Sequence, residues 1–539
     1  MARVIFALCY LALFWTKPAL ASLSEDLLNI VSINLGPSSL VNQITEVSEA
    51  IDKANEKIID LVAPTIAQRA ATSCLITNLI FDQNVHTKAS PNYTEDEDIN
   101  WSQTCRLPAA CFIHPQSTVE VAIALKVITA TGTKFSIRGG GHNPNPGFGS
   151  VDSQGVLLDL QDMKIMSIDS DGTLHAGPGH RWIDLYEFSA ANNRTVKGGR
   201  TIDVGVPGFI LGGGMPFFPA LHGLGADSVL NYEIVLANST VVNASHDQNP
   251  ELFRALKGGG SNFGIVTRFD IQTYPLLRSQ YVVNLYNSSD YLNIFQATIK
   301  VQDSMELDPK IDMYVTVTPT VVVVGMFYAD WVPQPPAAFD PFYQLESLVG
   351  KMVPLTNGTV TSLAVDLGAN TPQYNARLRR IPTAVTTTGD VELYIQNHEH
   401  FLKILDTVEP TFAANLSYTI QPVASTTVRE GNARRGNSLG LHSIPQIWWS
   451  MVVEWADKKN DLQAQQTLNA LDSNLRSIAN SRDELIPFQF MNDASFMQTV
   501  LDSYGSDNLA RLRSVAAHYD PTAVFQELQN DGFLLHKIK

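Results

Sequence analysis

The chain has 539 residues, of which 45% are hydrophobic and 17% are charged, and its formal net charge is −16 at pH 7. This composition is typical of a globular protein, and the length is sufficient for two or three domains. Because a strongly negative chain is repelled by phosphate backbones and anionic lipids, we expect neither a nucleic acid nor a membrane surface as its main partner.

The N-terminus has the pattern of a secretory signal peptide. Arg3 precedes an apolar run from Val4 to Trp15, and Ala19-Leu20-Ala21 supplies the small residues of a cleavage site. The run is too short for a membrane anchor, which needs about 20 apolar residues. We therefore expect residues 1–21 to be removed, and the mature chain to be secreted or kept in the lumen of the secretory pathway.

Glycosylation sequons and cysteines agree with an oxidising compartment. The Asn-x-Ser/Thr sites expected to accept glycans are Asn92, Asn100, Asn193, Asn238, Asn243, Asn287, Asn357 and Asn415. Once the signal is removed, Cys74, Cys105 and Cys111 remain, so we expect one disulfide and one unpaired cysteine. No histidine or second cysteine stands beside them at ligand spacing, so we expect no metal site.

Residues 22–106 are predicted to form an N-terminal helical extension followed by a loop. Apolar residues between positions 22 and 66 recur in a pattern typical of helices, and what they pack against stays open. Residues 87–102 are polar and include the acidic run from Glu95 to Asp98, which indicates a surface loop.

Three glycine-rich segments follow in the first half of the chain. The first, Arg138 to Asn143, comes between a predicted strand at residues 132–137 and another at 156–160. The second runs from Gly198 to Gly214, and the third from Leu256 to Thr267. Glycines let a backbone approach a ligand closely and expose amide N–H groups, which suits a pyrophosphate. Since a single glycine loop is also common in surface turns, the prediction depends on all three segments.

The second half of the chain has a different pattern. Between residues 276 and 483, strand-like runs such as Ile311–Thr318, Val321–Phe327 and Gln446–Trp455 alternate with helices such as Gln463–Ile478. This pattern predicts a second α+β domain built on an antiparallel sheet. The last predicted helix contains Leu509, Leu512 and Val515 and ends at Tyr519-Asp520-Pro521.

The order of these motifs resembles a known family. The three glycine segments, followed near the C-terminus by Phe490–Ala494 and Tyr504-Gly505, resemble the berberine-bridge-enzyme-like members of the vanillyl-alcohol-oxidase and p-cresol-methylhydroxylase (PCMH) flavoprotein family. The match covers roughly Pro108 to Pro275 and resumes near the C-terminus. The resemblance implies FAD as the cofactor.

The resemblance also implies the fold class and its division. The expected fold is α+β, with a two-lobed FAD-binding domain of PCMH type and a substrate domain whose antiparallel sheet is covered by helices. We expect the FAD-binding domain at residues 107–280, the substrate domain at 281–480, and at 481–539 a C-terminal segment that returns to the FAD-binding domain.

The resemblance assigns several residues to the cofactor. His142 occupies the position where the family attaches the flavin 8α-methyl group to an imidazole; a histidine that merely lines the loop is the alternative. Thr201 stands where some relatives carry a second, cysteine-linked attachment, so we expect one covalent link. The complete expected cofactor-binding set is Arg138, Gly139, Gly140, Gly141, His142, Asn143, Thr201, Val204, Gly205, Val206, Gly208, Gly212, Gly213, Gly214, Gly264, Ile265 and Asn492. The family pattern also favours a Cys74–Cys111 disulfide with Cys105 reduced.

The catalytic residues follow less directly from the sequence. Val206 aligns with a family position beside the reactive face of the flavin, where a small residue admits dioxygen; a core valine is the alternative. Two tyrosines that are common in relatives are replaced here by Phe490 and Asp493, so Asp493 is the favoured base for taking a substrate hydroxyl proton. The second candidate base is Glu454, which lies on a predicted strand and would otherwise be solvated.

These observations predict a secreted, monomeric FAD-dependent oxidase that passes electrons from a small organic substrate to dioxygen. The missing tyrosines favour a secondary metabolite as substrate, whose oxidation can be coupled to ring closure. The alternatives are an FAD-dependent monooxygenase of an aromatic metabolite, a carbohydrate oxidase, and a protein that keeps the fold as a binding scaffold.

Overall fold

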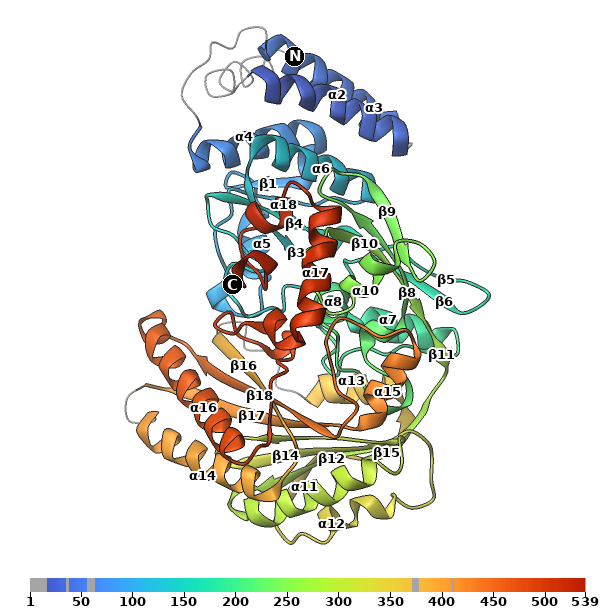
Figure 1. Cartoon of the computed structure of the whole chain (residues 1–539), viewed down its shortest axis with the longest axis vertical. Helices are drawn as coiled ribbons and strands as arrows, with labels where there is room; N and C mark the ends of the chain where they lie inside the picture. Colours follow the sequence, from blue (N-terminus) through green and yellow to red (C-terminus); the bar gives the residue numbers. More distant parts are fainter. Residues whose placement is uncertain (1–16, 35–37, 56–63, 371–377, 409–411, 539) are drawn as a thin grey trace.

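The computed structural model of the chain describes residues 17–34, 38–55, 64–370, 378–408 and 412–538 (Figure 1). Most of the predicted signal peptide, residues 1–16, lies outside the described residues, so its removal stays a prediction. The described chain combines helices with three larger sheets, which confirms the α+β class.

The N-terminal extension is a pair of helices that covers the first lobe. α2 (Lys17–Asn34) and α3 (Ser38–Asn55) lie beside α4 (Ile66–Phe81) and α6 (Thr118–Thr131) at one end of the molecule (Figure 1). Leu27 and Ile44 are fully buried in the same core as Ile123 of α6. The apolar positions of the extension therefore serve to cover α6, which sequence periodicity alone did not show.

The first lobe contains a four-stranded sheet in the order β1-β2-β4-β3. Its members are β1 (Val85–Thr87), β2 (Cys111–Ile113), β4 (Gly155–Asp159) and β3 (Lys134–Arg138). β4 pairs in parallel with both β2 and β3, and α6 makes the crossover from β2 to β3. Ser117 caps α6 by accepting a hydrogen bond from the Glu120 N–H, three residues further along. The glycine loop that begins at Gly139 leaves the end of β3.

A disulfide joins α4 to β2. It links Cys74 and Cys111, whose Cα atoms lie 5.9 Å apart, while Cys105 is buried and reduced. The pairing that the resemblance implied is therefore present. We expect Cys74→Ser to lower the free energy of unfolding by about 2–5 kcal/mol, because the unfolded chain loses a cross-link.

Denaturant unfolding followed by circular dichroism measures this effect. Cys105→Ser is the matched control, since it replaces a buried but unbridged cysteine. A stability loss in Cys74→Ser no larger than that of the control would contradict the prediction.

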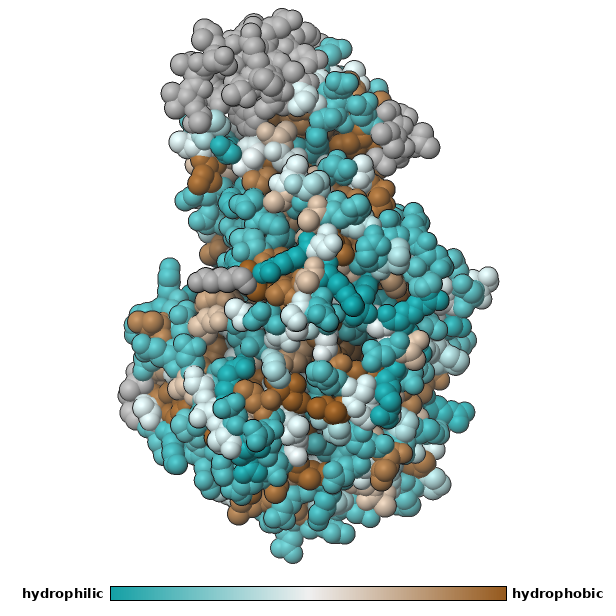
Figure 2. All heavy atoms as spheres, viewed as in Figure 1, coloured by the Kyte–Doolittle hydropathy of each residue, from teal (hydrophilic) through white to brown (hydrophobic). Residues whose placement is uncertain are grey.

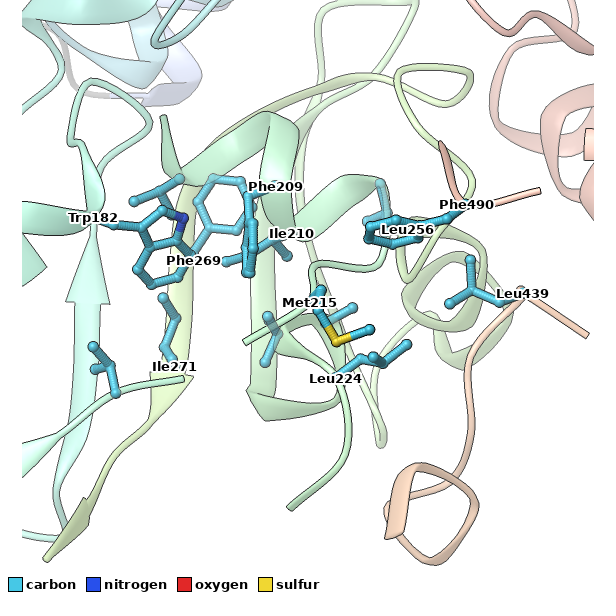
Figure 3. Packing of buried hydrophobic residues seen from close by; sticks show 14 of the residues in the cluster. Trp182, Phe209, Ile210, Met215, Leu224, Leu256, Phe269, Ile271, Leu439 and Phe490 are labelled. Carbon is cyan, nitrogen blue, oxygen red and sulfur yellow. The ribbon is translucent and has the colours of Figure 1, made fainter. Parts of the chain in front are cut away.

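The second lobe is built on an antiparallel five-stranded sheet in the order β5-β6-β10-β8-β9. Its members are β5 (Met166–Ile168), β6 (Thr173–Ala176), β10 (Ile265–Gln272), β8 (Val229–Val235) and β9 (Val241–Ser245). The core beside this sheet holds Trp182 of α7 (Trp182–Ala191) and Phe209 of α8 (Val206–Leu211), as Figure 3 shows. Phe490 and Leu439, from the second half of the chain, lie near Leu256 of α10 (Pro250–Leu256) in the same core.

The third sheet is antiparallel and has eight strands. In sheet order they are β15 (Leu348–Thr359), β12 (Arg278–Asn287), β14 (Val321–Tyr328), β13 (Ile311–Val317), β17 (Ala414–Val423), β18 (Gln446–Trp455), β16 (Arg379–Thr387) and β19 (Leu485–Ile486). Because side chains alternate along a strand, its two faces join two different cores. Val282 packs under the helices α11 (Tyr291–Met305), α14 (Val391–Val408) and α16 (Asp461–Ser481), whereas Val283 packs toward the second lobe.

The C-terminal segment runs back to the first lobe. Its helix α17 (Ser506–Tyr519) is followed by a further short helix, α18 (Val524–Glu527), so α17 is not the last helix that the sequence suggested. Beyond α18, the Phe135 N–H donates to the Leu528 carbonyl and the Asn530 N–H donates to the Phe135 carbonyl, at 3.0 and 2.7 Å. These bonds attach the segment to the free edge of β3.

Shorter elements connect these layers. They are α5 (Tyr93–Asp98), α9 (Pro219–His222), α12 (Asp340–Tyr343), α13 (Val360–Asn370), α15 (Ser425–Ala433) and the strand pair β7 (Arg194–Thr195) and β11 (Tyr274–Pro275). The helix α5 corrects the prediction of a surface loop, because its Asp96 and the following Asn100 are only 4% and 3% exposed.

The burial of Asn100 also corrects one predicted glycosylation site. This residue is 3% exposed and its Nδ2 donates to the Cys105 carbonyl at 2.7 Å, so the folded site leaves no room for a glycan. Asn243 is half-buried, and the remaining six predicted sites are exposed.

The viewed surface is mostly hydrophilic, with hydrophobic side chains in scattered groups (Figure 2). Among the described helices, none combines the length and the apolar composition needed to cross a bilayer.

Candidate active site

The base of the first glycine loop is held by Arg138. This side chain is 1% exposed, and its Nε donates to Asp159 Oδ2 of β4 at 2.9 Å. Its Nη1 donates to the Asp96 carbonyl of α5 at 2.8 Å. The sequence placed Arg138 among the cofactor-binding residues, but the structure uses its guanidinium to hold the loop against α5 and β4.

The first two glycine segments meet backbone to backbone. A Cβ added to Gly140 would lie 2.5 Å from the Gly205 Cα, and one added to Gly205 would lie 2.5 Å from the Gly140 N. Real Cβ atoms do not approach other atoms so closely, so glycine is required at both positions. Gly208 is exposed and has open space where its side chain would be. We call this close approach and the open space beside Gly208 the glycine cradle.

The C-terminal segment closes the same cradle. Asn492 Nδ2 donates to the Gly208 carbonyl at 2.9 Å, and the Gly214 N–H donates to Asn492 Oδ1 at 3.1 Å. From the third glycine segment, the Gly260 N–H donates to the Leu211 carbonyl at 3.1 Å. All three glycine segments and Asn492 are therefore joined by short contacts.

The last predicted cofactor residues of the third segment have a packing role. Gly264 lies against β8, where an added Cβ would be 2.6 Å from the Val235 carbonyl oxygen. Ile265 opens β10, pairs with Val235 and is 1% exposed. Both residues join the third glycine segment to the sheet of the second lobe.

His142 lies in an aromatic and cationic stack. Its ring is parallel to Trp101, with centroids 4.6 Å apart and an interplanar angle of 11°. The Arg380 guanidinium carbon lies 4.3 Å from the centroid of the Trp101 ring. Burial lowers the pKa of His142 to about 3, and the positive charges of Arg181 and Arg380 act in the same direction. The imidazole is therefore neutral at the pH of any cellular compartment, the form in which a ring nitrogen can act as a nucleophile.

Thr201, Val204 and Asp203 belong to the turn that faces this stack. Asp203 Oδ1 lies 3.8 Å from His142 Nε2. Thr201 and Val204 are half-buried, and the Val204 N–H donates to the Thr201 carbonyl at 3.4 Å. Asn143, at the end of the first loop, is exposed, and its Oδ1 accepts from the Asn145 N–H at 2.9 Å.

A second polar group surrounds Asp493, where the lobes meet the eight-stranded sheet. Gln421 Nε2 of β17 donates to Asp493 Oδ2 at 2.9 Å. Arg200 then donates to Gln421 Oε1 at 3.3 Å and to Asp312 Oδ1 of β13 at 3.1 Å. We call these four residues, Asp493, Gln421, Arg200 and Asp312, the Asp493 group.

Burial controls the protonation of this group. It raises the pKa of Asp493 to about 6, although the hydrogen bond from Gln421 and the charge of Arg200 act to lower it. Burial also raises the pKa of Asp312, which is 0% exposed and whose Oδ2 accepts from the Phe218 N–H at 3.0 Å. A carboxyl that titrates near neutral pH can act as a general base.

Glu454 is not part of the Asp493 group. Its side chain is 26% exposed, and its Oε1 accepts from Arg380 Nε at 2.6 Å rather than contacting the Asp493 group. Gln421 pairs with Trp448 in the sheet, and Glu454 follows Trp448 by six positions on the same strand. At about 3.3 Å per residue, Glu454 lies roughly 20 Å along the strand from Gln421. The two candidate bases are therefore too far apart to act on one reacting atom.

Sequence reasoning missed Trp101, Arg380, Gln421 and Asp312. The sequence held a signal for Asp312, which is a lone carboxylate in the apolar strand Ile311–Val317. An isolated buried charge needs a partner, so its position indicated a polar contact across the fold. No comparable signal marked Gln421, because a glutamine in a strand is more often exposed.

Comparisons with known proteins agree with these features. A family model described as an FAD binding domain matches residues 109–245. The FAD-dependent monooxygenase macF of Penicillium terrestre is 34% identical over 471 residues, which cover 86% of this chain and 89% of that protein. The bifunctional solanapyrone synthase of Alternaria solani is 33% identical over 447 residues, which cover 82% of this chain and 85% of that protein.

Solved structures share the fold at lower sequence identity. 6-Hydroxy-D-nicotine oxidase of Arthrobacter nicotinovorans gives a TM-score of 0.71 at 21% identity and covers 83% of this chain and 97% of its own. The glucooligosaccharide oxidase of Acremonium strictum, whose crystal structure reveals a novel flavinylation, gives a TM-score of 0.68 at 18% identity. It covers 86% of this chain and 99% of its own.

Proposed function

Because the chain belongs to the berberine-bridge-enzyme-like, vanillyl-alcohol-oxidase family of FAD-dependent oxidoreductases, we propose that it oxidises a small secondary metabolite with dioxygen as the electron acceptor. The observation that supports this proposal best is the Asp493 group. It places a carboxyl with a pKa of about 6 between the glycine cradle and the eight-stranded sheet.

The glycine cradle fits FAD. Gly140 and Gly205 allow a close backbone approach, and Gly208 borders open space. We assign the diphosphate to the backbone of the Gly139–Asn143 loop, whose glycines are half-buried, and the covalent flavin bond to the neutral ring of His142. FAD held there would supply the two-electron chemistry, as acceptor of a hydride from the substrate carbon and donor of electrons to dioxygen.

The chain itself moves the proton. Gln421 holds Asp493 Oδ2, so Oδ1 is the oxygen that we assign to the substrate hydroxyl. Above its pKa, Asp493 accepts the hydroxyl proton, while Arg200 stabilises the resulting network through Gln421 and Asp312.

The neighbourhood of Asp493 favours an apolar metabolite over a sugar. Trp448, which pairs with Gln421 in the sheet, has its ring centroid 4.4 Å from that of Phe490. Arg200 lies over the ring of Tyr314, 5.8 Å from its centroid. These aromatic side chains flank the Asp493 group, whereas a sugar site needs more hydrogen-bonding partners.

A monooxygenase is the second candidate, and the name of the relative at 34% identity favours it. Two measurements on purified enzyme separate the candidates. Anaerobic mixing with a panel of aromatic metabolites, alcohols and sugars identifies substrates by bleaching of the flavin. With air, an oxidase releases one hydrogen peroxide per substrate, whereas a monooxygenase transfers an oxygen-18 label from dioxygen to its product. Absence of bleaching with every class would contradict the oxidase, whereas a monooxygenase that takes its two electrons from an external reductant such as NADPH would still label its product with oxygen-18.

We also propose that the enzyme acts as a secreted, glycosylated monomer. The signal-like residues 1–21 and the exposed sequons Asn92, Asn193, Asn238 and Asn287 support this proposal. Peptide mass mapping of secreted protein identifies the mature N-terminus and the occupied sites, and light scattering gives the mass of the particle.

Val206 provides a test of oxygen access. It is 0% exposed at the start of α8, and its N–H donates to the His180 carbonyl at 3.1 Å. We expect Val206→Leu to slow reoxidation of the reduced flavin and to spare substrate oxidation, because the extra methylene fills the space that oxygen crosses. Overpacking costs about 1–3 kcal/mol, and each 1.4 kcal/mol on this step is a tenfold change in rate.

Stopped-flow mixing of prereduced enzyme with oxygenated buffer gives the reoxidation rate directly. Val206→Ala is the matched control, since it empties the same space. An unchanged reoxidation rate in a folded, flavin-loaded Val206→Leu enzyme would assign Val206 to the core alone.

A further inference from the structure

Three potential metal ligands come together behind the first glycine loop. His86 belongs to β1, Asp96 to α5, and His114 directly follows β2. His86 Nδ1 lies 2.5 Å and His114 Nε2 lies 3.1 Å from the same carboxylate oxygen, Asp96 Oδ2. All three atoms lie within 4.8 Å of one another. The sequence indicated no metal site because these ligands come from three separate elements.

The geometry of this cluster is close to that of a zinc site. Zinc bonds of about 2.0–2.2 Å in a tetrahedron place the ligand atoms roughly 3.3–3.5 Å apart. The two distances to Asp96 Oδ2 are slightly shorter than this separation, so shifts of under about 1 Å would make room for the ion. Two imidazoles and one carboxylate are also a donor set that zinc accepts.

The surroundings of the cluster support the same ligand. Behind His114, Nδ1 lies 3.4 Å from Gln161 Nε2 and 4.0 Å from Asp162 Oδ2. A metal-binding histidine usually donates its second ring N–H to an acceptor such as a carboxylate, and Asp162 Oδ2 is the acceptor here, whereas the Gln161 amide nitrogen can only donate. The side chain of His86 is 18% exposed, which gives the ion an entry path and leaves room for a water ligand.

We propose that His86, Asp96 and His114 bind one zinc ion, with water as the fourth ligand, and that this ion fixes α5 behind the glycine loop. The Asp96 carbonyl accepts from Arg138 at the base of the loop. The Trp101 N–H donates to the Gly141 carbonyl at 2.9 Å, and Asn100 Oδ1 would lie 3.1 Å from a Cβ on Gly141. The ion therefore has a structural role: it anchors the segment that positions Trp101 against His142.

The test uses the full secreted enzyme, prepared without a histidine tag and stripped with a chelator. Titration with Zn²⁺ alone in a calorimeter should give one saturable site, and elemental analysis after dialysis should give one zinc per chain. Co²⁺ in its place should give the visible absorption bands of a tetrahedral N/O site. Asp96→Asn and His86→Gln should each retain less than a tenth of an equivalent of zinc.

His175 provides a matched control. Its ring nitrogens lie 2.6 Å from Asp270 and 2.9 Å from Asp169, so it is another histidine held by carboxylates. His175→Gln should keep the full zinc equivalent. If Asp96→Asn fails to fold, His86→Gln decides the question, because that side chain is partly exposed and its loss should be tolerated.

Two results would overturn the proposal. One is the absence of saturable Zn²⁺ binding in the stripped wild-type enzyme, which would leave the cluster as a hydrogen-bonded triad. The other is a full zinc equivalent in folded His86→Gln. Zinc should also raise the melting temperature of the wild-type enzyme and leave that of His86→Gln unchanged. These measurements do not depend on the oxidation reaction, so they stand or fall separately from the proposed function.

Discussion

Replacing Asp493 by asparagine is expected to lower kcat/KM by roughly 10²–10⁴-fold, the usual contribution of a general base. The asparagine amide still accepts the hydrogen bond from Gln421 but cannot take a proton. In the wild-type enzyme, kcat/KM should rise tenfold per pH unit up to the Asp493 pKa of about 6 and then level off. Steady-state rates between pH 4.5 and 9 give both results, and the variant should lose this pH dependence.

The same substitution should stabilise the protein above pH 6. Because the pKa of Asp493 is raised in the folded state, that state binds more protons than the unfolded chain between about pH 4 and pH 6. The free energy of unfolding therefore falls as pH rises through this window and stays lower above it. Asp493→Asn removes this loss, which is up to about 3 kcal/mol for two pKa units. Urea unfolding at pH 4.5 and pH 8 measures the difference.

Glu454→Gln is the control that separates the two candidate bases. Since Glu454 pairs with Arg380 and lies far along the sheet from Gln421, its loss should change kcat/KM by less than about tenfold. An Asp493→Asn enzyme that keeps more than a tenth of wild-type activity, together with an inactive Glu454→Gln, would reverse the assignment.

His142→Ala is expected to abolish the covalent flavin. After acid denaturation of the wild-type protein, yellow fluorescence should stay on the polypeptide band. After the same treatment of the variant, the band should carry no fluorescence. Some FAD should still bind without the bond, because the glycine cradle is unchanged. Turnover should fall by about tenfold or more, equal to 1.4 kcal/mol, as the flavin loses its fixed position.

His222 offers a matched control for this variant. It is stacked on Tyr274 with centroids 4.1 Å apart and an interplanar angle of 11°, the same angle as that between His142 and Trp101. His222→Ala removes a stacked imidazole outside the cradle and should keep the full covalent flavin. Fluorescence that leaves the wild-type band on denaturation would show that the linkage does not form.

Local patterns predicted the elements well where a residue's neighbours in the sequence decide its conformation. The strand Gln446–Trp455 has the predicted bounds, and the strand predicted at Ile311–Thr318 ends one residue earlier, at Val317. The glycine segments likewise marked a place where two backbones meet closely, since the contact at Gly140 and Gly205 tolerates no other residue. These features depend on residue type and short spacing alone.

Long-range contacts could not be predicted in the same way. Arg200, Asp312 and Gln421 are each more than 100 residues from the next, and only the sheet order brings them to Asp493. Asp96 looked like one of four solvated acids until two histidines from separate segments were found beside it. Where a polar side chain finds its partner across the fold, its burial and its protonation state depend on the tertiary structure.

The hydrogen bonds of Asn492 have a consequence for biosynthesis. Gly208 and Gly214 emerge from the ribosome nearly three hundred residues before Asn492, and the partner of the β3 edge, Asn530, emerges later still. Domains generally fold in order as they emerge, and contacts this distant in sequence form late. The glycine cradle is thus completed only once residues 492–530 have been made, so a nascent chain that still lacks them cannot hold its cofactor firmly, and a variant without residues 490–539 would leave both lobes without their closing segment.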